Sequence, residues 1–137
     1  MAHVASHAAL DRLARQTHYR HGRWAEWLAV ALLMMRGYRI LGRRQRTPFG
    51  EIDVVARRGG RVAFIEVKLR RTLAEAEASL TPRQAERIGR AAECWMNGHR
   101  AFQDHEMGMD LVLVVPWAWP RHLRNAFHAS WDSWRRR

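Results

Sequence analysis

The sequence predicts a small α/β domain in which helices flank a mixed β-sheet. Two segments, near residues 22–36 and 82–97, carry apolar residues at the three- and four-residue spacing of amphipathic helices. Between them, residues 52–56 and 62–67 form two runs rich in β-branched residues, and a further apolar run follows at 111–115. At 137 residues, the chain has the length of one domain with its own core.

The first helix is expected over residues 22–36, and Gly37 is well placed to end it. One stripe of large apolar residues follows helical spacing, and we expect this stripe to face the core. It consists of Trp24, Trp27, Leu28, Ala31, Leu32 and Met35. A short strand-like stretch follows at residues 38–41, where basic residues interrupt the apolar ones.

The two β-branched runs are predicted to form a hairpin. Gly59-Gly60 lies between them and suits a two-residue turn, because such turns require positive φ. With that turn, Asp53 lies directly opposite Glu66. Because side chains alternate between the two faces of a strand, these two and the charged pair just beyond them project from one face. The other two are Glu51 and, opposite it, Lys68.

The second helix begins with a capping pattern. Thr81 is expected as the N-cap, Pro82 as the first helical residue and Gln84 as the end of a capping box, while Gly98 ends the helix. After the strand at 111–115 and a loop containing Trp117 and Trp119, residues 123–131 are predicted to form the last strand.

The charge of the chain indicates a polyanionic partner. With 24 basic and 13 acidic residues, the net charge is +11, which favours nucleic acid or an acidic membrane surface. The longest apolar run, residues 27–35, is too short to cross a bilayer, and residues 1–9 lack a signal-peptide pattern. We therefore expect a cytoplasmic protein without a membrane partner. Its single domain, residues 22–131, would lie between a basic lead-in (1–21) and a basic tail (132–137).

The opposed carboxylates are the candidate for chemistry. Like charges facing each other across a ladder repel, so a cation between Asp53 and Glu66 would relieve a real cost. Hard divalent cations such as Mg²⁺ and Mn²⁺ prefer oxygen ligands, and the carbonyl of Val67 is a further candidate ligand. The alternative is that these residues face water and that Glu51 and Lys68 form an ordinary cross-strand ion pair.

The lysine in this group is the only one in the chain; the other 23 basic residues are arginine. Lysine is a compact donor whose pKa can be tuned, whereas the arginine fork always carries its charge. This difference favours a chemical role for Lys68, such as stabilising negative charge on a phosphate.

Asp53 followed by Glu66-Val67-Lys68 on adjacent strands resembles the core of the PD-(D/E)XK nucleases. The wider sequence resembles the YraN-like family of small bacterial proteins over residues 22–128. The stretches that carry the resemblance are 22–26, 37–41, 50–53, 64–68, 81–83, 110–112 and 125–127. Ile52 stands where the superfamily has proline, as is usual in this branch, while Gln45 and Gln84 depart from the common pattern of the family.

The resemblance implies a restriction-endonuclease-like core, similar to Holliday junction resolvases. It also implies a Mg²⁺- or Mn²⁺-dependent DNA endonuclease that hydrolyses phosphodiester bonds, acts on branched DNA and works as a homodimer. Asp53, Glu66 and Glu26 match the acidic metal-binding residues, and Lys68 matches the catalytic lysine. The alternative is a nucleic-acid-binding module that keeps the nuclease fold with little or no catalysis.

Arginines on three segments are candidates for phosphate contact. They are Arg43, Arg44 and Arg46 before the hairpin, Arg70 and Arg71 after it, and Arg83, Arg87 and Arg90 along the second helix. The alternative for the helix is a solvated face with Glu86 and Glu93 as ion-pair partners. Trp117 and Trp119 are suited to base stacking, with a dimer contact or loop packing as the alternatives.

Overall fold

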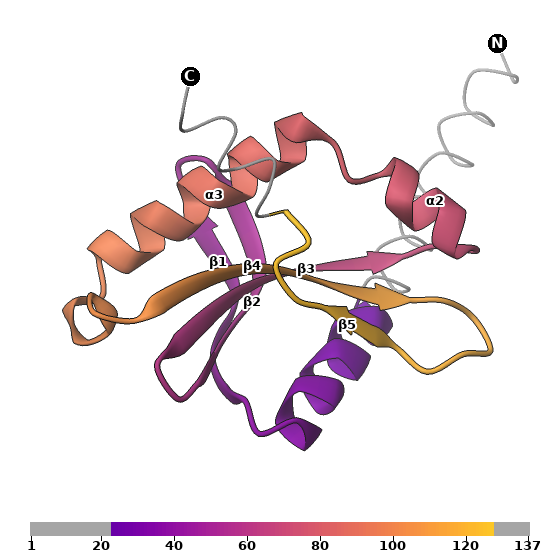
Figure 1. Cartoon of the computed structure of the whole chain (residues 1–137), viewed down its shortest axis with the longest axis horizontal. Coiled ribbons are helices and arrows are strands. Elements are labelled where there is room, and N and C mark those ends of the chain that lie inside the picture. The colour runs from indigo at the N-terminus through magenta and orange to yellow at the C-terminus, as the bar shows by residue number, and fades with distance from the viewer. Residues whose placement is uncertain (1–22, 128–137) are drawn as a thin grey trace, which may run out of the picture.

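A computed structural model describes residues 23–127 of the chain. These residues form a five-stranded sheet with a helix on either face, which confirms the predicted α/β class (Figure 1). The lead-in at 1–21 and the tail at 132–137 lie outside the described residues, so the predicted division of the chain stays a prediction.

The N-terminal helix occupies residues 23–35 of the described part and is followed by the β1–β2 and β2–β3 hairpins. The remaining elements are β1 (Arg39–Thr47), β2 (Gly50–Arg58), β3 (Arg61–Leu69), α2 (Leu73–Ala78), α3 (Pro82–Asn97), η1 (Arg100–Phe102), β4 (Glu106–Val114) and β5 (Arg121–Leu123). The strand order is β1-β2-β3-β4-β5. All neighbours are antiparallel except β3 and β4, because α2 and α3 form a crossover between these two strands.

Local sequence signals placed several boundaries correctly. The side chain of Thr81 accepts a hydrogen bond from the backbone N–H of Gln84, Pro82 opens α3 and Gly98 caps its end. Gly37 ends the N-terminal helix with φ +85°, the left-handed conformation that favours glycine there.

The hairpin register also matches the prediction. Val54 lies opposite Ile65 and Arg58 opposite Arg61, which leaves Gly59-Gly60 as the turn. Only Gly59 has positive φ (58°), as in a type II′ turn, where only the first central position needs it.

The predicted core stripe of the N-terminal helix is wrong in part, because only Leu28 and Leu32 of its members pack against the core. Trp24, Trp27 and Met35 are exposed, and the helix instead buries Ala25, Ala29, Val30 and Leu33 against the sheet. The helix is apolar on most of its circumference, so periodicity allowed two core faces. The alanine face wins because small side chains let the helix backbone lie close to the strands.

The strand boundaries differ from the predictions at both ends of the sheet. β1 runs to Thr47 rather than ending near residue 41, and its arginines lie on a strand with only one neighbour in the sheet. The last strand ends at Leu123, because the chain turns through Asn125, whose φ is +54°. Residues 124–127 are therefore not strand, and 128–131 lie outside the described part. The short helix α2, begun by a Thr72 cap, was not predicted.

A buried ion pair joins three strands, and the sequence did not indicate it. The guanidinium of Arg61 on β3 donates two hydrogen bonds, of 2.8 and 2.6 Å, to the carboxylate of Asp110 on β4. His122 Nε2 on β5 lies 2.7 Å from the same carboxylate, and the backbone N–H of Asn125 donates to it at 2.9 Å. The lack of a side chain at Gly108 is required here, since a Cβ would lie 2.0 Å from the guanidinium.

Candidate functional site

The carboxylates predicted for chemistry lie where β2 and β3 stop pairing. The ladder between the two strands ends at Val54 and Ile65, one residue short of Asp53 and Glu66. Beyond that point, the backbone N–H of Val67 donates to Asp53 Oδ2 at 2.8 Å. The Asp53 carboxylate thus takes the place of a backbone acceptor, and it lies beside the peptide group of Val67.

The environment of Asp53 disfavours its charged form. Burial, followed by the nearby charge of Glu66, raises the pKa of Asp53 from 3.8 to about 7. The Val67 hydrogen bond and the charge of Arg87 act in the opposite direction but do not compensate, and Glu26 adds a smaller repulsion. The three predicted carboxylates therefore share one electrostatic environment, in which a cation would be stabilising.

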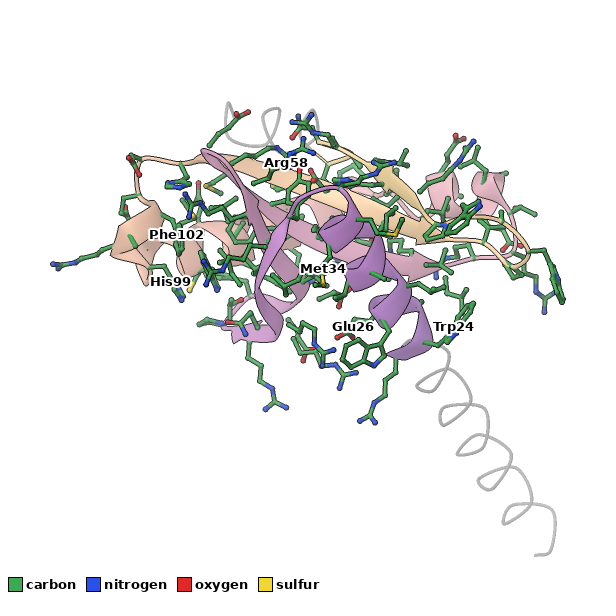
Figure 2. All side chains as sticks on the ribbon, turned by 90° about the horizontal axis from the view of Figure 1, so that it is seen from below. Trp24, Glu26, Met34, Arg58, His99 and Phe102 are labelled. Atoms are coloured by element: carbon green, nitrogen blue, oxygen red, sulfur yellow. The ribbon has the colours of Figure 1, made fainter. Side chains whose placement is uncertain are left out.

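Glu26 reaches this environment from the N-terminal helix and is only 8% exposed (Figure 2). The Nε of Arg44 on β1 donates to Glu26 Oε2 at 3.2 Å, and the Nε of Arg43 lies 3.9 Å from Oε1. Glu26 Oε1 is buried and has no hydrogen-bond partner. Such an atom is costly to bury unless a partner completes its coordination.

Arg44 holds an uncommon backbone conformation for this contact. Its φ is +50°, inside a strand, at the position between the pairs Arg43–Val54 and Gln45–Ile52. A non-glycine residue with positive φ is uncommon and often marks a functional site. No local signal in the sequence indicated that Arg44 would face Glu26, which lies 18 positions earlier.

Glu66 is also paired with an arginine. Nη2 of Arg87 on α3 donates to Glu66 Oε2 at 3.0 Å, and Nη1 of the same guanidinium donates to the carbonyl of Glu51 at 3.2 Å. The side chain of Glu51 is exposed and lies opposite Arg46 on β1. Within residues 23–127, Glu51 therefore forms no ion pair with Lys68, and that expected alternative is wrong.

Lys68 lies beside the carboxylates and is only 5% exposed. Burial lowers the pKa of its ammonium group, while the charges of Glu66 and Asp53 act to raise it. Lys68 is thus a buried ammonium group near two carboxylates, and the expectation that arginine cannot replace it stays a prediction.

The residues at this site suit a hard divalent cation in their chemistry. Asp53, Glu66 and Glu26 supply carboxylate oxygens, and Glu26 Oε1 lacks a hydrogen-bond partner. The carbonyl of Val67 stays a candidate ligand. As the side chains stand, no three histidine, cysteine, aspartate or glutamate residues of the described chain converge closely enough to hold a metal. Arg44 and Arg87 donate to Oε2 of Glu26 and Oε2 of Glu66, so a cation that binds these oxygens would have to displace the two arginines.

The predicted arginines fall into two groups. Arg43, Arg44 and Arg87 contact the carboxylates of the candidate site. The others do not contact these carboxylates: Arg46, Arg71 and Arg83 are exposed, Arg70 donates to the carbonyl of Leu69 and its charge acts on Lys68, and Arg90 pairs with Glu86 four positions earlier. The structure thus brings part of the set to the site and leaves part on the surface.

The described residues include no helix long and apolar enough to cross a membrane. Their fold and site define the class: an α/β protein with a five-stranded mixed sheet, compatible with a restriction-endonuclease-like core, with a carboxylate–lysine cluster where the central hairpin opens.

Comparison with known proteins identifies the family. Residues 25–114 match the family described as "Uncharacterised protein family UPF0102", and the chain belongs to it. UPF0102 proteins of Mesorhizobium japonicum and Maricaulis maris are 50% and 52% identical to this chain over 84% and 86% of its length, and over 92% of their own. One from Rhodopseudomonas palustris is 48% identical over 92% of both chains.

Proposed function

We propose that the chain is a DNA endonuclease that hydrolyses phosphodiester bonds with Mg²⁺ or Mn²⁺. The observation that carries this proposal is the carboxylate cluster around Asp53. An aspartate with a pKa near 7, a buried glutamate oxygen without a hydrogen-bond partner and a nearly buried lysine are costly in a resting fold. A divalent cation would relieve that cost and would be held by Glu26, Asp53, Glu66 and the carbonyl of Val67.

The other residues have roles that follow from their positions. A bound cation supplies positive charge against the oxygens of the scissile phosphate. Lys68 stabilises the negative charge that develops on the phosphate as water attacks phosphorus. Arg44 and Arg87, once displaced from Glu26 and Glu66, move to neighbouring phosphates, together with the surface arginines around the site.

The proposal extends to the substrate and the assembly. By their resemblance to Holliday junction resolvases, UPF0102 chains would act on branched DNA as two-fold dimers, because a two-fold assembly matches a two-fold branched substrate. The chain would do so in the cytoplasm, where bacterial chromosomal DNA lies.

One observation favours a second function, a nucleic-acid-binding module without catalysis. Arginines already neutralise two of the three carboxylates, and a site closed in this way could serve structure alone. The two functions separate on one experiment. Purified protein is incubated with linear, single-stranded, flapped and four-way-junction DNA, in Mn²⁺ or in EDTA.

The endonuclease proposal predicts cleavage that requires Mn²⁺ and falls at least a hundredfold in both Lys68→Ala and Lys68→Arg. Lys68→Arg is the sharper variant, because it keeps the charge and changes only the shape and acidity of the donor. Cleavage that survives in Lys68→Ala, or no metal-dependent cleavage of any substrate, would contradict the proposal. Binding without cleavage would favour the second function.

A further inference from the structure

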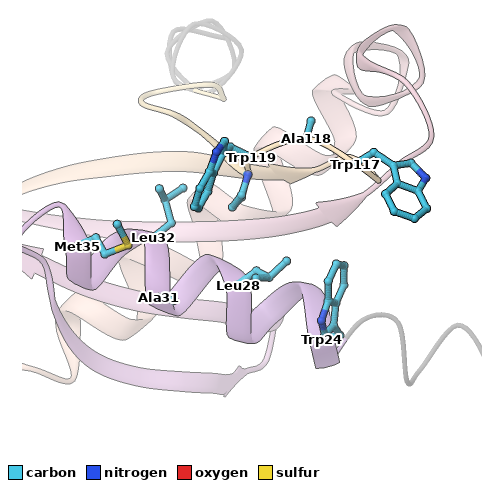
Figure 3. A pocket seen from close by; sticks show the side chains of 9 residues that line it. Trp24, Leu28, Ala31, Leu32, Met35, Trp117, Ala118 and Trp119 are labelled. Atoms are coloured by element: carbon cyan, nitrogen blue, oxygen red, sulfur yellow. The ribbon is translucent and has the colours of Figure 1, made fainter.

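An open apolar groove lies between the N-terminal helix and the loop that joins β4 to β5 (Figure 3). It encloses about 420 Å³, and its walls are Trp24, Leu28, Ala31, Leu32 and Met35 from the helix and residues 117–120 from the loop. The indole of Trp119 extends from the loop toward the helix, and that of Trp24 rises from the first described turn of the helix toward the loop.

The tryptophans of this groove are costly to the folded chain. Trp117 is fully exposed and Trp119 is 83% exposed, so loop packing, one of the alternatives expected from the sequence, does not account for them. Trp117 also has φ +66°, a left-handed conformation that bulky side chains rarely adopt. Two indoles in solvent, one on a strained backbone, indicate a surface built to receive a partner.

The charges around the groove indicate what kind of partner it receives. In the sequence, Arg23, Arg36 and Arg121 directly flank three lining residues, Trp24, Met35 and Pro120, and all three arginines are exposed; we call them the rim arginines. The loop carries no acidic residue, and the described part of the helix carries only Glu26, which is buried against Arg44. An apolar floor with a basic rim complements a ligand that combines flat apolar rings with negative charge.

We infer that this groove binds unpaired bases of a DNA strand by stacking on Trp117, Trp119 and Trp24, with the rim arginines on its phosphates. A second copy of the chain fits less well, because each copy has a net charge of +11 and would bring the same basic rim to the interface. Paired bases are also excluded, since their faces are already stacked within the duplex.

The groove lies near the candidate site. The inference that the bound strand is a substrate rests on the proposed function. Trp24 and Glu26 project to opposite sides of the helix (Figure 2), but the loop that carries Trp117 and Trp119 leaves β4 just after Leu113, which lies beside Lys68 in the sheet. A strand whose phosphate lies at Asp53 and Glu66 could therefore place a neighbouring unpaired base against the indoles. The substrate class is then DNA with single-stranded nucleotides next to the cut, such as a flap, gap or branch point.

The test compares a labelled twelve-nucleotide thymidine strand with a blunt duplex of equal length, by fluorescence anisotropy in EDTA so that no cleavage occurs. The double variant Trp117→Ala/Trp119→Ala removes two exposed indoles that support no core. It should bind the single strand at least tenfold more weakly and the duplex less than threefold more weakly. Met34→Ala, an exposed residue of the same helix outside the groove, is the matched control and should change neither affinity.

Unchanged single-strand affinity in the double variant, or equal losses on strand and duplex, would overturn the inference. A wild-type dimer that becomes monomeric in the variant while single-strand affinity is unchanged would assign the groove to a second copy instead. Cleavage in Mn²⁺ separates this inference from the proposed function. If the wild-type chain cuts no substrate but the double variant binds the single strand more weakly, only the proposed nuclease is refuted. If the wild-type chain cuts and the double variant binds and cuts equally well, only the inferred groove is refuted.

Discussion

Two aspartates of the same sheet, the buried Asp110 and the half-buried Asp53, have opposite electrostatic environments. Burial by itself would raise the pKa of Asp110, but hydrogen bonds from Arg61, His122 and the Asn125 backbone lower it to about 2. Asp53 has one backbone hydrogen bond and two carboxylate neighbours, and its pKa is about 7. The first aspartate is charged and fully partnered within the chain. Around the second, the positive charges of Arg87 and Lys68 do not offset burial and the charge of Glu66.

This difference separates a structural carboxylate from a candidate functional one. A chain that could place Arg61 against Asp110 with two short hydrogen bonds could in principle have done the same at Asp53. At Asp53 it instead gathers Glu66, Glu26 and a nearly buried lysine. Sites that hold a metal or a substrate commonly cost stability in this way.

The largest effect on stability is expected from substituting Asp110, the aspartate that is fully partnered within the chain. Asp110→Asn leaves the Arg61 guanidinium buried opposite a neutral group, which should reduce the free energy of unfolding by about 3–5 kcal/mol. Urea denaturation followed by circular dichroism measures it. Asp104→Asn changes an exposed aspartate near the same strand and should leave the midpoint unchanged. Equal midpoints for both variants would show that the Arg61–Asp110 pair does not hold the sheet.

In the metal-free chain, substitution of Asp53 is expected to raise the free energy of unfolding rather than lower it. Because its folded pKa lies above the unfolded value, its ionisation disfavours folding, and stability should fall as pH rises from about 4 to 7. Asp53→Asn removes this cost, so the variant should be more stable than wild type by about 1–3 kcal/mol at pH 8. The difference should shrink toward zero near pH 4. Thermal unfolding in EDTA across this pH range measures it, and a variant less stable than wild type at pH 8 would refute the assignment.

The smallest effect is expected on Mn²⁺ affinity, and it distinguishes arginines that contact the carboxylates from those that do not. Arg87→Ala removes the partner of Glu66, so Mn²⁺ should bind a few-fold more tightly, while the salt dependence of DNA binding should lose about one phosphate contact. Arg90→Ala should lower the salt dependence equally and leave Mn²⁺ affinity unchanged, because Arg90 pairs with Glu86 outside the site. If both variants bind Mn²⁺ like wild type, Arg87 does not compete with the cation.

Local signals in the sequence predicted the parts of the fold that local physics determines. The Thr81–Pro82 start of α3 and the glycine turn of the hairpin each follow from a few neighbouring residues, and the hairpin register placed Asp53 beside Glu66. The exposed face of the N-terminal helix was mispredicted, because which apolar face is buried depends on how closely a distant sheet approaches.

The missed contacts share one physical cause. Arg61 with Asp110, Arg44 with Glu26 and Arg87 with Glu66 join residues 49, 18 and 21 positions apart. Among so many arginines, composition offers no way to tell which guanidinium will meet which carboxylate. The lone lysine stood out for the opposite reason, since a chain otherwise built with arginine uses it once, at a nearly buried position.

Calorimetric titration of Mn²⁺ into the metal-free chain tests the central claim most directly, because it measures whether the site around Asp53 binds a divalent cation. The account predicts binding at pH 8 that weakens about tenfold per pH unit below pH 7, as a proton competes for Asp53, and that Asp53→Asn abolishes. Asp104→Asn should bind like wild type. No binding at pH 8, or equal affinity in Asp53→Asn, would contradict the account.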